Sequence, residues 1–232
     1  MSETQIPQPE DFEAWNESMS KKYDPDLFHR KSSWVVRFLE RERVKWVLRF
    51  VDAQQDDRIL EVGCGAGNVL ERIHCGELYG VDLSNYMVEN ARRRLGTRAG
   101  IQKADAAKMP FADGYFTKVF CTEVLEHVLH PPKVVVEMSR VLAPEGSLIV
   151  SVPNERLITL LKRSLKRLGI YALVLRFRDG YQAPEVNEWH LHEFDIERLR
   201  ETLQPFFHLE RLKGVPSRVF AMHYVGLCRR NG

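Results

Sequence analysis

Three glycines within five residues, Gly63, Gly65 and Gly67, constrain the fold of this 232-residue chain more than any other feature. They follow residues 59–62, a mostly apolar run with the length of a buried strand. Glycines at alternate positions weaken the interior of a helix or strand, but they suit a tight turn whose main chain faces a ligand. Apolar residues at helical spacing come next and predict a helix near 68–74. The segment is typical of the first strand–turn–helix unit of an open α/β sheet, where nucleotides bind.

A second predicted strand, residues 77–82, ends at Asp82. This acid lies about 20 residues beyond the first glycine, the distance expected of a carboxylate that binds ribose hydroxyls. Capping of the following helix is the alternative role, and the upstream glycine turn favours the ribose. A dinucleotide fingerprint would place its third glycine at position 68, which is Asn68 here. An NAD-linked oxidoreductase is therefore disfavoured.

Five segments in fixed order give the sequence a family resemblance over about residues 55–155. They are 61–67 (EVGCGAG), 81–84 (VDLS), 104–106 (ADA), 121–127 (CTEVLEH) and 142–148 (LAPEGSL). In these segments the chain resembles class I S-adenosylmethionine-dependent methyltransferases, although the family more often has Pro-Gly-Gly than the Pro-Glu-Gly at 144–146. The resemblance implies an α/β fold with a doubly wound, mostly parallel seven-stranded sheet whose last strand is antiparallel. The alternation of strand and helix patterns over 58–152 favours the same parallel sheet.

The resemblance also implies S-adenosyl-L-methionine as the cofactor. Amides of the glycine turn would hold its methionine end, Asp82 its ribose, and Asp105 and Ala106 its adenine. A turn role for Asp105 is the alternative. The expected cofactor-binding residues are Glu61, Gly63, Cys64, Gly65, Asp82, Leu83, Asp105, Ala106 and Thr122.

The loop after the fourth predicted strand, residues 121–127, carries two carboxylates and an imidazole and should line the cleft beside the cofactor. In one interpretation its charges only cap the loop or face water. In a second, His127 acts as a general base or orients an acceptor hydroxyl, with His190 or His192 as the second candidate. The predicted catalytic residues are accordingly His127 and His192.

A third interpretation is a divalent cation bound by Glu123, Glu126, His127 and a distant histidine, His192. On a helical turn positions 123, 126 and 127 share one face, and His190 and His192 would point the same way in an extended segment. The pattern resembles the metal-assisted 2′-O-methyltransferases of small RNAs and some ubiquinone-pathway O-methyltransferases. Many metal-free methyltransferases share the Glu-x-x-Glu-His motif, so the cation is the less favoured interpretation.

The chain divides into an N-terminal helical cap, 1–52, and a methyltransferase core, 53–232, which includes a helical insertion at 154–193. The insertion is amphipathic and basic. A solvated helical hairpin is the favoured interpretation, and a lid or membrane-surface patch that admits an amphiphilic acceptor is the alternative. RNA binding is less favoured, because no aromatic stacking platform is evident.

Bulk properties narrow the function further. A net charge of +2 gives no general case for nucleic-acid binding, and four cysteines without a C-x-x-C pair favour a reduced, cytoplasmic setting. We therefore expect methyl transfer to a small-molecule acceptor, with O-methylation as the expected reaction. The alternatives are a metal-assisted RNA 2′-O-methyltransferase and a non-catalytic S-adenosylmethionine-binding protein. Neither the acceptor nor the oligomeric state follows from the sequence.

Overall fold

The structure is a computed structural model that describes residues 7–8, 10–23, 32–169 and 189–231. The helices are α1 (Phe12–Lys22), α3 (Trp34–Val51), α4 (Asn85–Leu95), α5 (Pro131–Val141), α6 (Glu155–Arg167) and α8 (Ile196–Leu203). The strands are β1 (Arg58–Val62), β2 (Glu77–Asp82), β3 (Ala99–Lys103), β4 (Phe116–Thr122), β5 (Leu142–Pro153), β6 (Phe207–Pro216) and β7 (Ala221–Arg230).

The strands form one seven-stranded sheet in the order β3-β2-β1-β4-β5-β7-β6. The first five strands in this order are parallel, and β7 runs antiparallel to both β5 and β6. This confirms the predicted doubly wound sheet with an antiparallel last strand. In the register, Val62 of β1 lies between Val81 of β2 and Cys121 of β4. The loops that follow these three strands therefore meet at one edge of the sheet.

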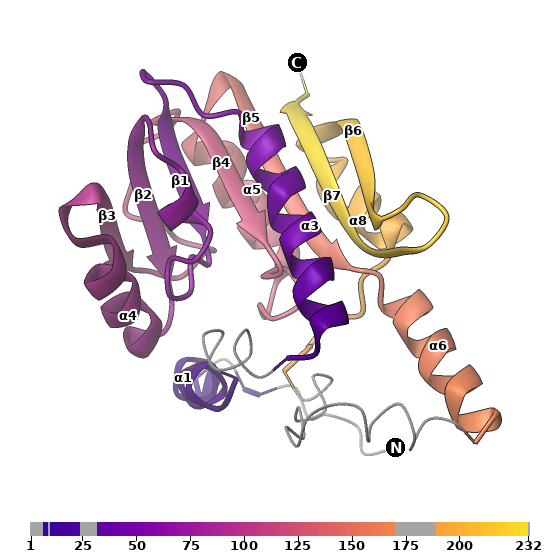
Figure 1. Cartoon of the computed structure of the whole chain (residues 1–232). Helices are drawn as coiled ribbons and strands as arrows, with labels where there is room; N and C mark the ends of the chain where they lie inside the picture. Colours follow the sequence, from indigo (N-terminus) through magenta and orange to yellow (C-terminus); the bar gives the residue numbers. More distant parts are fainter. Residues whose placement is uncertain (1–6, 9, 24–31, 170–188, 232) are drawn as a thin grey trace.

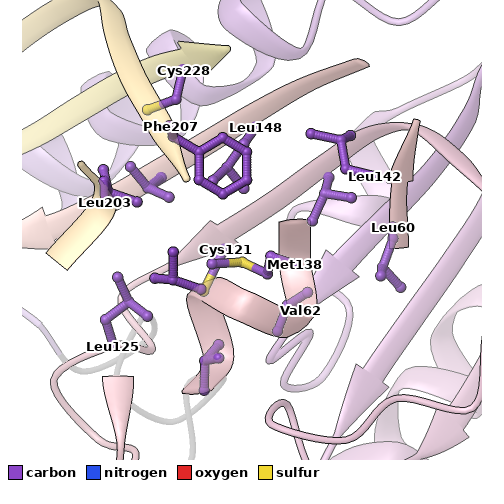
Figure 2. Packing of buried hydrophobic residues seen from close by; sticks show 14 of the residues in the cluster. Leu60, Val62, Cys121, Leu125, Met138, Leu142, Leu148, Leu203, Phe207 and Cys228 are labelled. Atoms are coloured by element: carbon purple, nitrogen blue, oxygen red, sulfur yellow. The ribbon is translucent and has the colours of Figure 1, made fainter. Parts of the chain in front are cut away.

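Alternate residues of β1 enter two separate layers of packing. Ile59 belongs to the cluster that α3 and α4 cover, with Val47 and Ala91 as helix partners. Leu60 faces the opposite layer, where Met138 of α5 packs. Figure 2 shows this second layer, in which side chains from the sheet, α5 and the C-terminal segment converge. Burial on both faces fixes the register of the central strands, because a one-residue slip would reverse every side chain.

Capping side chains set the starts of α3, α6 and α8, and Ser84 caps α4 in the same way. Ser33, Asn154 and Asp195 accept hydrogen bonds from the amides of Val36, Leu157 and Arg198, at the starts of α3, α6 and α8. Each bond satisfies an amide that has no partner within its own helix. The predicted helix starts near Ser33, Asn154 and Asp195 are confirmed.

The predicted helix at 68–74 is wrong, because the segment contains only a short 3-10 turn, Leu70–Arg72. The chain has to reach β2 at Glu77 within ten residues of Gly67, and Gly76 reverses it with a φ of +79°. Little room remains for a full helix in so short a connection.

The proposed helical insertion is described only in part. Helix α6 extends away from the sheet (Figure 1), and residues 170–188 of the predicted insertion lie outside the described residues. Helix α3, assigned to the N-terminal cap, packs on β5, β6 and β7. The division at residue 52 stays a prediction. Within the described ranges, no helix has both the length and the apolar character needed to cross a membrane.

Candidate functional site

The turn after β1 has the main-chain conformation that its glycines predict. Gly63, Gly65 and Gly67 have φ values of +69°, +52° and +79°. A Cβ on Gly63 would lie 2.4 Å from a methyl group of Val124, whereas one on Gly65 would meet nothing within 4 Å. Gly63 therefore allows close packing against the loop after β4. Gly65 presents bare main chain to open space, as a bound ligand requires.

Asp82 holds this turn in place from the end of β2. Its Oδ2 accepts a 2.9 Å hydrogen bond from the Gly65 amide, and its Oδ1 accepts one of the same length from Ser84. Burial raises the pKa of the Asp82 carboxyl above its ordinary value, and the two amides oppose that shift. Each carboxylate oxygen keeps a lone pair, so Asp82 can still accept a hydrogen bond from a ribose hydroxyl.

Glu61 is a buried acid on β1, the strand that pairs with β2 and its terminal Asp82. It is 2% exposed, and among the described residues its Oε2 has no hydrogen-bond partner. Burial raises the pKa of Glu61 well above its ordinary value, and Asp82 adds to the shift. A buried acid with an unsatisfied oxygen beside an open glycine turn fits a cofactor that carries a positive charge. The residues present thus suit the sulfonium and ammonium groups of S-adenosylmethionine.

The other expected cofactor residues occupy distinct positions around the turn. Cys64 is 4% exposed and packs in the α3–α4 layer, so it can offer the site only its main chain. Leu83 and Thr122 are half-buried at the ends of β2 and β4. Asp105 is exposed and its Oδ1 accepts a hydrogen bond from Ala107, while Ala106 is half-buried beside it. A turn role for Asp105 is therefore present in the structure, and its adenine role stays a prediction.

Helix α1 covers this edge of the sheet. Figure 1 shows α1 beyond the arrowheads of β2 and β4, and α1 contacts α4. Its Glu17 accepts hydrogen bonds from the Ser84 hydroxyl at 2.7 Å and from the Tyr86 amide. The residues that α1 buries are polar, Asn16 and Ser20. A helix that covered only a hydrophobic core would bury apolar residues, so this face suits a polar ligand.

The Glu123 side chain binds residues outside the loop at 121–127 and does not join Glu126 and His127. Its φ of +56° is left-handed, and its carboxylate accepts bonds from the Ser151 hydroxyl at 2.8 Å and from Nδ1 of His223 at 3.0 Å. Burial alone would raise the pKa of Glu123, but the positive charges of His223 and Arg43 outweigh it and lower the pKa to about 2. The expectation that Glu123, Glu126 and His127 share one helical face is corrected, because the left-handed residue redirects the chain.

Glu126, His127 and His190 come together instead. Their potential ligand atoms lie within 4.8 Å of one another. Nδ1 of His127 is 3.1 Å from the Trp189 carbonyl oxygen, and Nδ1 of His190 contacts the Glu155 carboxylate. Burial and the neighbouring His190 lower the pKa of His127 to about 3, so its imidazole is neutral near pH 7.

His192 lies in a different environment. Its Nε2 donates to the carbonyl oxygens of Val128 at 2.9 Å and Leu129 at 3.3 Å, and Arg198 lies next to its Nδ1. The amides of both Leu191 and His192 donate to the Glu126 carbonyl oxygen, so the segment bends. The expectation that His190 and His192 point the same way is wrong, since it assumed an extended chain.

Sequence reasoning missed several residues of the site because their contacts are distant in sequence. Tyr23, at the end of α1, stacks on Trp189 with ring centroids 5.6 Å apart, and Trp189 lies 4.5 Å from His127. Arg43 of α3 is buried beside the Glu123–His223 pair and donates to Ser151. In the sequence, the signal for Arg43 is its position on the apolar face of the helix, four residues from both Leu39 and Val47.

A comparison with protein families matches residues 60–150 to the family described as methyltransferase domain. The matched region begins in β1 and ends in β5, so it contains the glycine turn, Asp82, Asp105 and the loop after β4.

Individual relatives are similar over larger parts of the chain. The chloroplastic tocopherol O-methyltransferase of Arabidopsis thaliana is 30% identical over 153 residues, which cover 60% of this chain and 44% of that protein. The 27-O-demethylrifamycin SV methyltransferase of Amycolatopsis mediterranei is 25% identical over 197 residues, covering 80% of this chain and 68% of that protein. The chain spans less than half the length of the first curated relatives it matches.

Solved structures share the fold. A SAM-dependent methyltransferase from Aquifex aeolicus superposes with a TM-score of 0.61 at 16% identity, covering 91% of this chain and 97% of that one. At this identity the similarity concerns the fold alone.

Proposed function

Because the chain belongs to the class I S-adenosylmethionine-dependent methyltransferases, we propose that it transfers the cofactor's methyl group to a hydroxyl of a small-molecule acceptor. The observation that carries this proposal is the arrangement of Asp82 and Glu61 around the open Gly65 main chain. It combines a proposed ribose acceptor, an unsatisfied acid and bare backbone at one edge of the sheet. These are the contacts that a positively charged sulfur nucleoside needs.

The protein's task in this reaction is mainly alignment. S-adenosylmethionine supplies an electrophilic methyl group, so the chain has to place acceptor oxygen, methyl carbon and sulfur in line and keep water out. The glycine turn and Asp82 would fix the cofactor. Helix α1 and the Tyr23–Trp189 stack would close the cleft from the other side.

His127 is the proposed contact for the acceptor hydroxyl. With Nδ1 next to the Trp189 carbonyl oxygen, Nε2 carries the lone pair that can accept a hydrogen bond. A pKa of about 3 makes the buried imidazole a weak base, so its first role is to orient the hydroxyl. His127 can take the proton of the acceptor hydroxyl only as the acceptor oxygen forms its bond to the methyl carbon, because the hydroxyl then becomes more acidic. The contacts of His192 favour a positioning role for the loop at Val128 and Leu129.

The proposed acceptor is amphiphilic. Exposed apolar side chains gather on the first turns of α3, with Trp34 at 74% and Phe38 at 48% exposure. Leu160 and Leu168 are exposed on and just after α6. Isolated exposed apolar residues are common, but such residues on both α3 and α6 suit an acceptor with an apolar part. Two relatives whose names refer to tocopherol and rifamycin support an O-methylation of this kind.

Turnover tests the proposal. The full chain is incubated with S-adenosylmethionine and separate pools of hydroxylated amphiphiles, amines and short RNAs, and S-adenosylhomocysteine is quantified. We expect product with the hydroxylated pool, and a loss of at least about a hundredfold in His127→Ala. Cofactor binding without product in any pool would support a non-catalytic binding protein instead. Product only with RNA would support the RNA 2′-O-methyltransferase alternative.

A further inference from the structure

We propose that Glu126, His127 and His190 form a binding site for a divalent transition-metal ion. The site offers two imidazole nitrogens and one carboxylate oxygen, a donor set that suits Zn²⁺, Co²⁺ or Fe²⁺ more than Mg²⁺ or Ca²⁺. The three ligand atoms lie within 4.8 Å of one another. Ligands of a tetrahedral ion at about 2.1 Å are roughly 3.4 Å apart, so closure needs side-chain movements on the order of 1 Å.

Both imidazoles have a second contact of the kind that metal-binding histidines make. The Nδ1–H of His127 faces the Trp189 carbonyl oxygen, and the Nδ1–H of His190 faces the Glu155 carboxylate. A donated Nδ1–H fixes the tautomer that leaves Nε2 with its lone pair. Metal-binding histidines commonly donate their other N–H to a carboxylate or a main-chain carbonyl in this way. Glu155 thus has the position of an outer carboxylate that orients His190.

The carboxylate of Glu126 is the second, independent observation. Glu126 is 1% exposed, and its Oε2 has no hydrogen-bond partner among the described residues. A buried acid with an unsatisfied oxygen is costly for a fold to keep. A cation between Glu126 and the two imidazoles would satisfy that oxygen and offset its charge.

This ligand set differs from the one expected from the sequence. Glu123 is held by Ser151 and His223, and His192 is held by the carbonyl oxygens of Val128 and Leu129. Neither residue belongs to the group of potential ligand atoms within the described part of the chain. In this ligand set His190 replaces His192, and no residue replaces Glu123. The ion would therefore keep one or more coordination positions open to a further ligand.

The location links the proposed ion to closure of the cleft. His190 follows Trp189, which stacks between His127 and Tyr23 of the α1 terminus. An ion at this point would join the segment at 189–192 to the loop at 126–127. When bound, it would lower the pKa of a hydroxyl that occupies its open position. The lone pair of His127 can serve either the ion or the acceptor hydroxyl, and metal binding decides between these two roles.

Titration of the chelator-treated full chain with CoCl₂, in the absence of S-adenosylmethionine, tests the inference. Visible d–d absorption should rise to a plateau at one Co²⁺ per chain and should be displaced by ZnSO₄. His190→Asn and Glu126→Gln should weaken Co²⁺ binding, and Glu155→Gln, which alters only the outer carboxylate, should weaken it about 10- to 100-fold. The exposed His74→Asn is the matched control and should bind Co²⁺ as the natural chain does.

Thermal unfolding of each metal-free variant shows whether it folds. If Glu126→Gln fails to fold, His190→Asn and His74→Asn still carry the comparison. Absence of d–d bands in the folded natural chain would overturn the inference, and so would equal affinities in folded His190→Asn and His74→Asn. Because binding is measured without cofactor or acceptor, failure here leaves the proposed methyl transfer standing, and failed turnover leaves the metal site standing.

Discussion

The Oδ2 atom of Asp82 accepts a 2.9 Å hydrogen bond from the main-chain amide of Gly65. This bond links the glycine turn after β1 to the end of β2. Through it Asp82, the acid expected to hold a ribose, also fixes the shape of the glycine turn. A half-buried carboxylate bonded to a main-chain amide is held rigidly, which lowers the entropy lost when a ligand binds. Asp82 therefore connects the local fold to the proposed cofactor site.

Alanine substitutions at two glycines should separate folding from cofactor binding. Both Gly63→Ala and Gly65→Ala carry a left-handed strain of about 1–2 kcal/mol. Gly63→Ala adds a contact of 2.4 Å with Val124, so its melting temperature should fall further than that of Gly65→Ala. Gly65→Ala should instead lose at least about tenfold in S-adenosylmethionine affinity, because its methyl group enters the space facing the ligand. Equal melting temperatures for the two variants would contradict this assignment.

The Glu123–His223 pair should give a defined pH window of stability. The pKa of Glu123 falls from its ordinary 4.5 to about 2, so its contribution is complete above about pH 4.5 and is lost as the pH falls toward 2. Burial alone would lower the pKa of His223, but the charge and hydrogen bond of Glu123 raise it above its ordinary 6.5. The contribution of His223 is therefore complete below pH 6.5 and is lost as the pH rises through the raised value. Together the two groups stabilise the fold most between about pH 4.5 and 6.5.

His223→Gln tests this window. Near pH 5.5 the natural chain should melt at least about 3 °C above the variant, and the difference should shrink as the pH rises past the raised pKa of His223. The exposed His74→Gln serves as the control and should follow the natural chain at every pH. A difference that grows with rising pH would contradict the ion pair.

The aromatic stack should matter for the acceptor more than for the cofactor. Trp189→Ala removes the ring between Tyr23 and His127, two contacts of about 0.5–1.5 kcal/mol each. The KM for the acceptor should rise about tenfold, with a small change in S-adenosylmethionine affinity. Phe220→Ala, which removes a ring that is 45% exposed between β6 and β7, is the matched control and should leave both the acceptor KM and the cofactor affinity unchanged. Steady-state kinetics in which acceptor and cofactor are varied in turn would reject the idea if only cofactor affinity changed.

Local patterns predicted the sheet and the glycine turn after β1 well. The strand before Gly63 and the strand that ends at Asp82 could be predicted from local sequence. Apolar runs and glycine positions within a few residues are enough to indicate a buried strand and a tight turn. The loop after β4 was harder. The left-handed φ of Glu123 follows from its bonds to Ser151 and His223, which are distant in sequence. No local pattern contains that information.

The choice between His190 and His192 shows the same limit. An i, i+2 pair shares a face only in an extended chain, and here the amides of Leu191 and His192 both donate to Glu126. In this bent segment the two imidazoles have different partners, Glu155 for His190 and the carbonyl oxygen of Val128 for His192. The packing of Trp189 between Tyr23 and His127 likewise depends on two segments meeting over the sheet edge. Tertiary contacts, not sequence spacing, determine which side chains gather around His127.

Calorimetric titration of the purified chain with S-adenosylmethionine tests the central claim most directly, with Asp82→Ala and the exposed Asp56→Ala measured beside it. The natural chain and Asp56→Ala should bind one equivalent with the same affinity. Asp82→Ala should bind about 10- to 100-fold more weakly, the loss expected when hydrogen bonds to a buried carboxylate are removed. Absence of binding heat in the natural chain, or an affinity unchanged in Asp82→Ala, would contradict the proposed cofactor site.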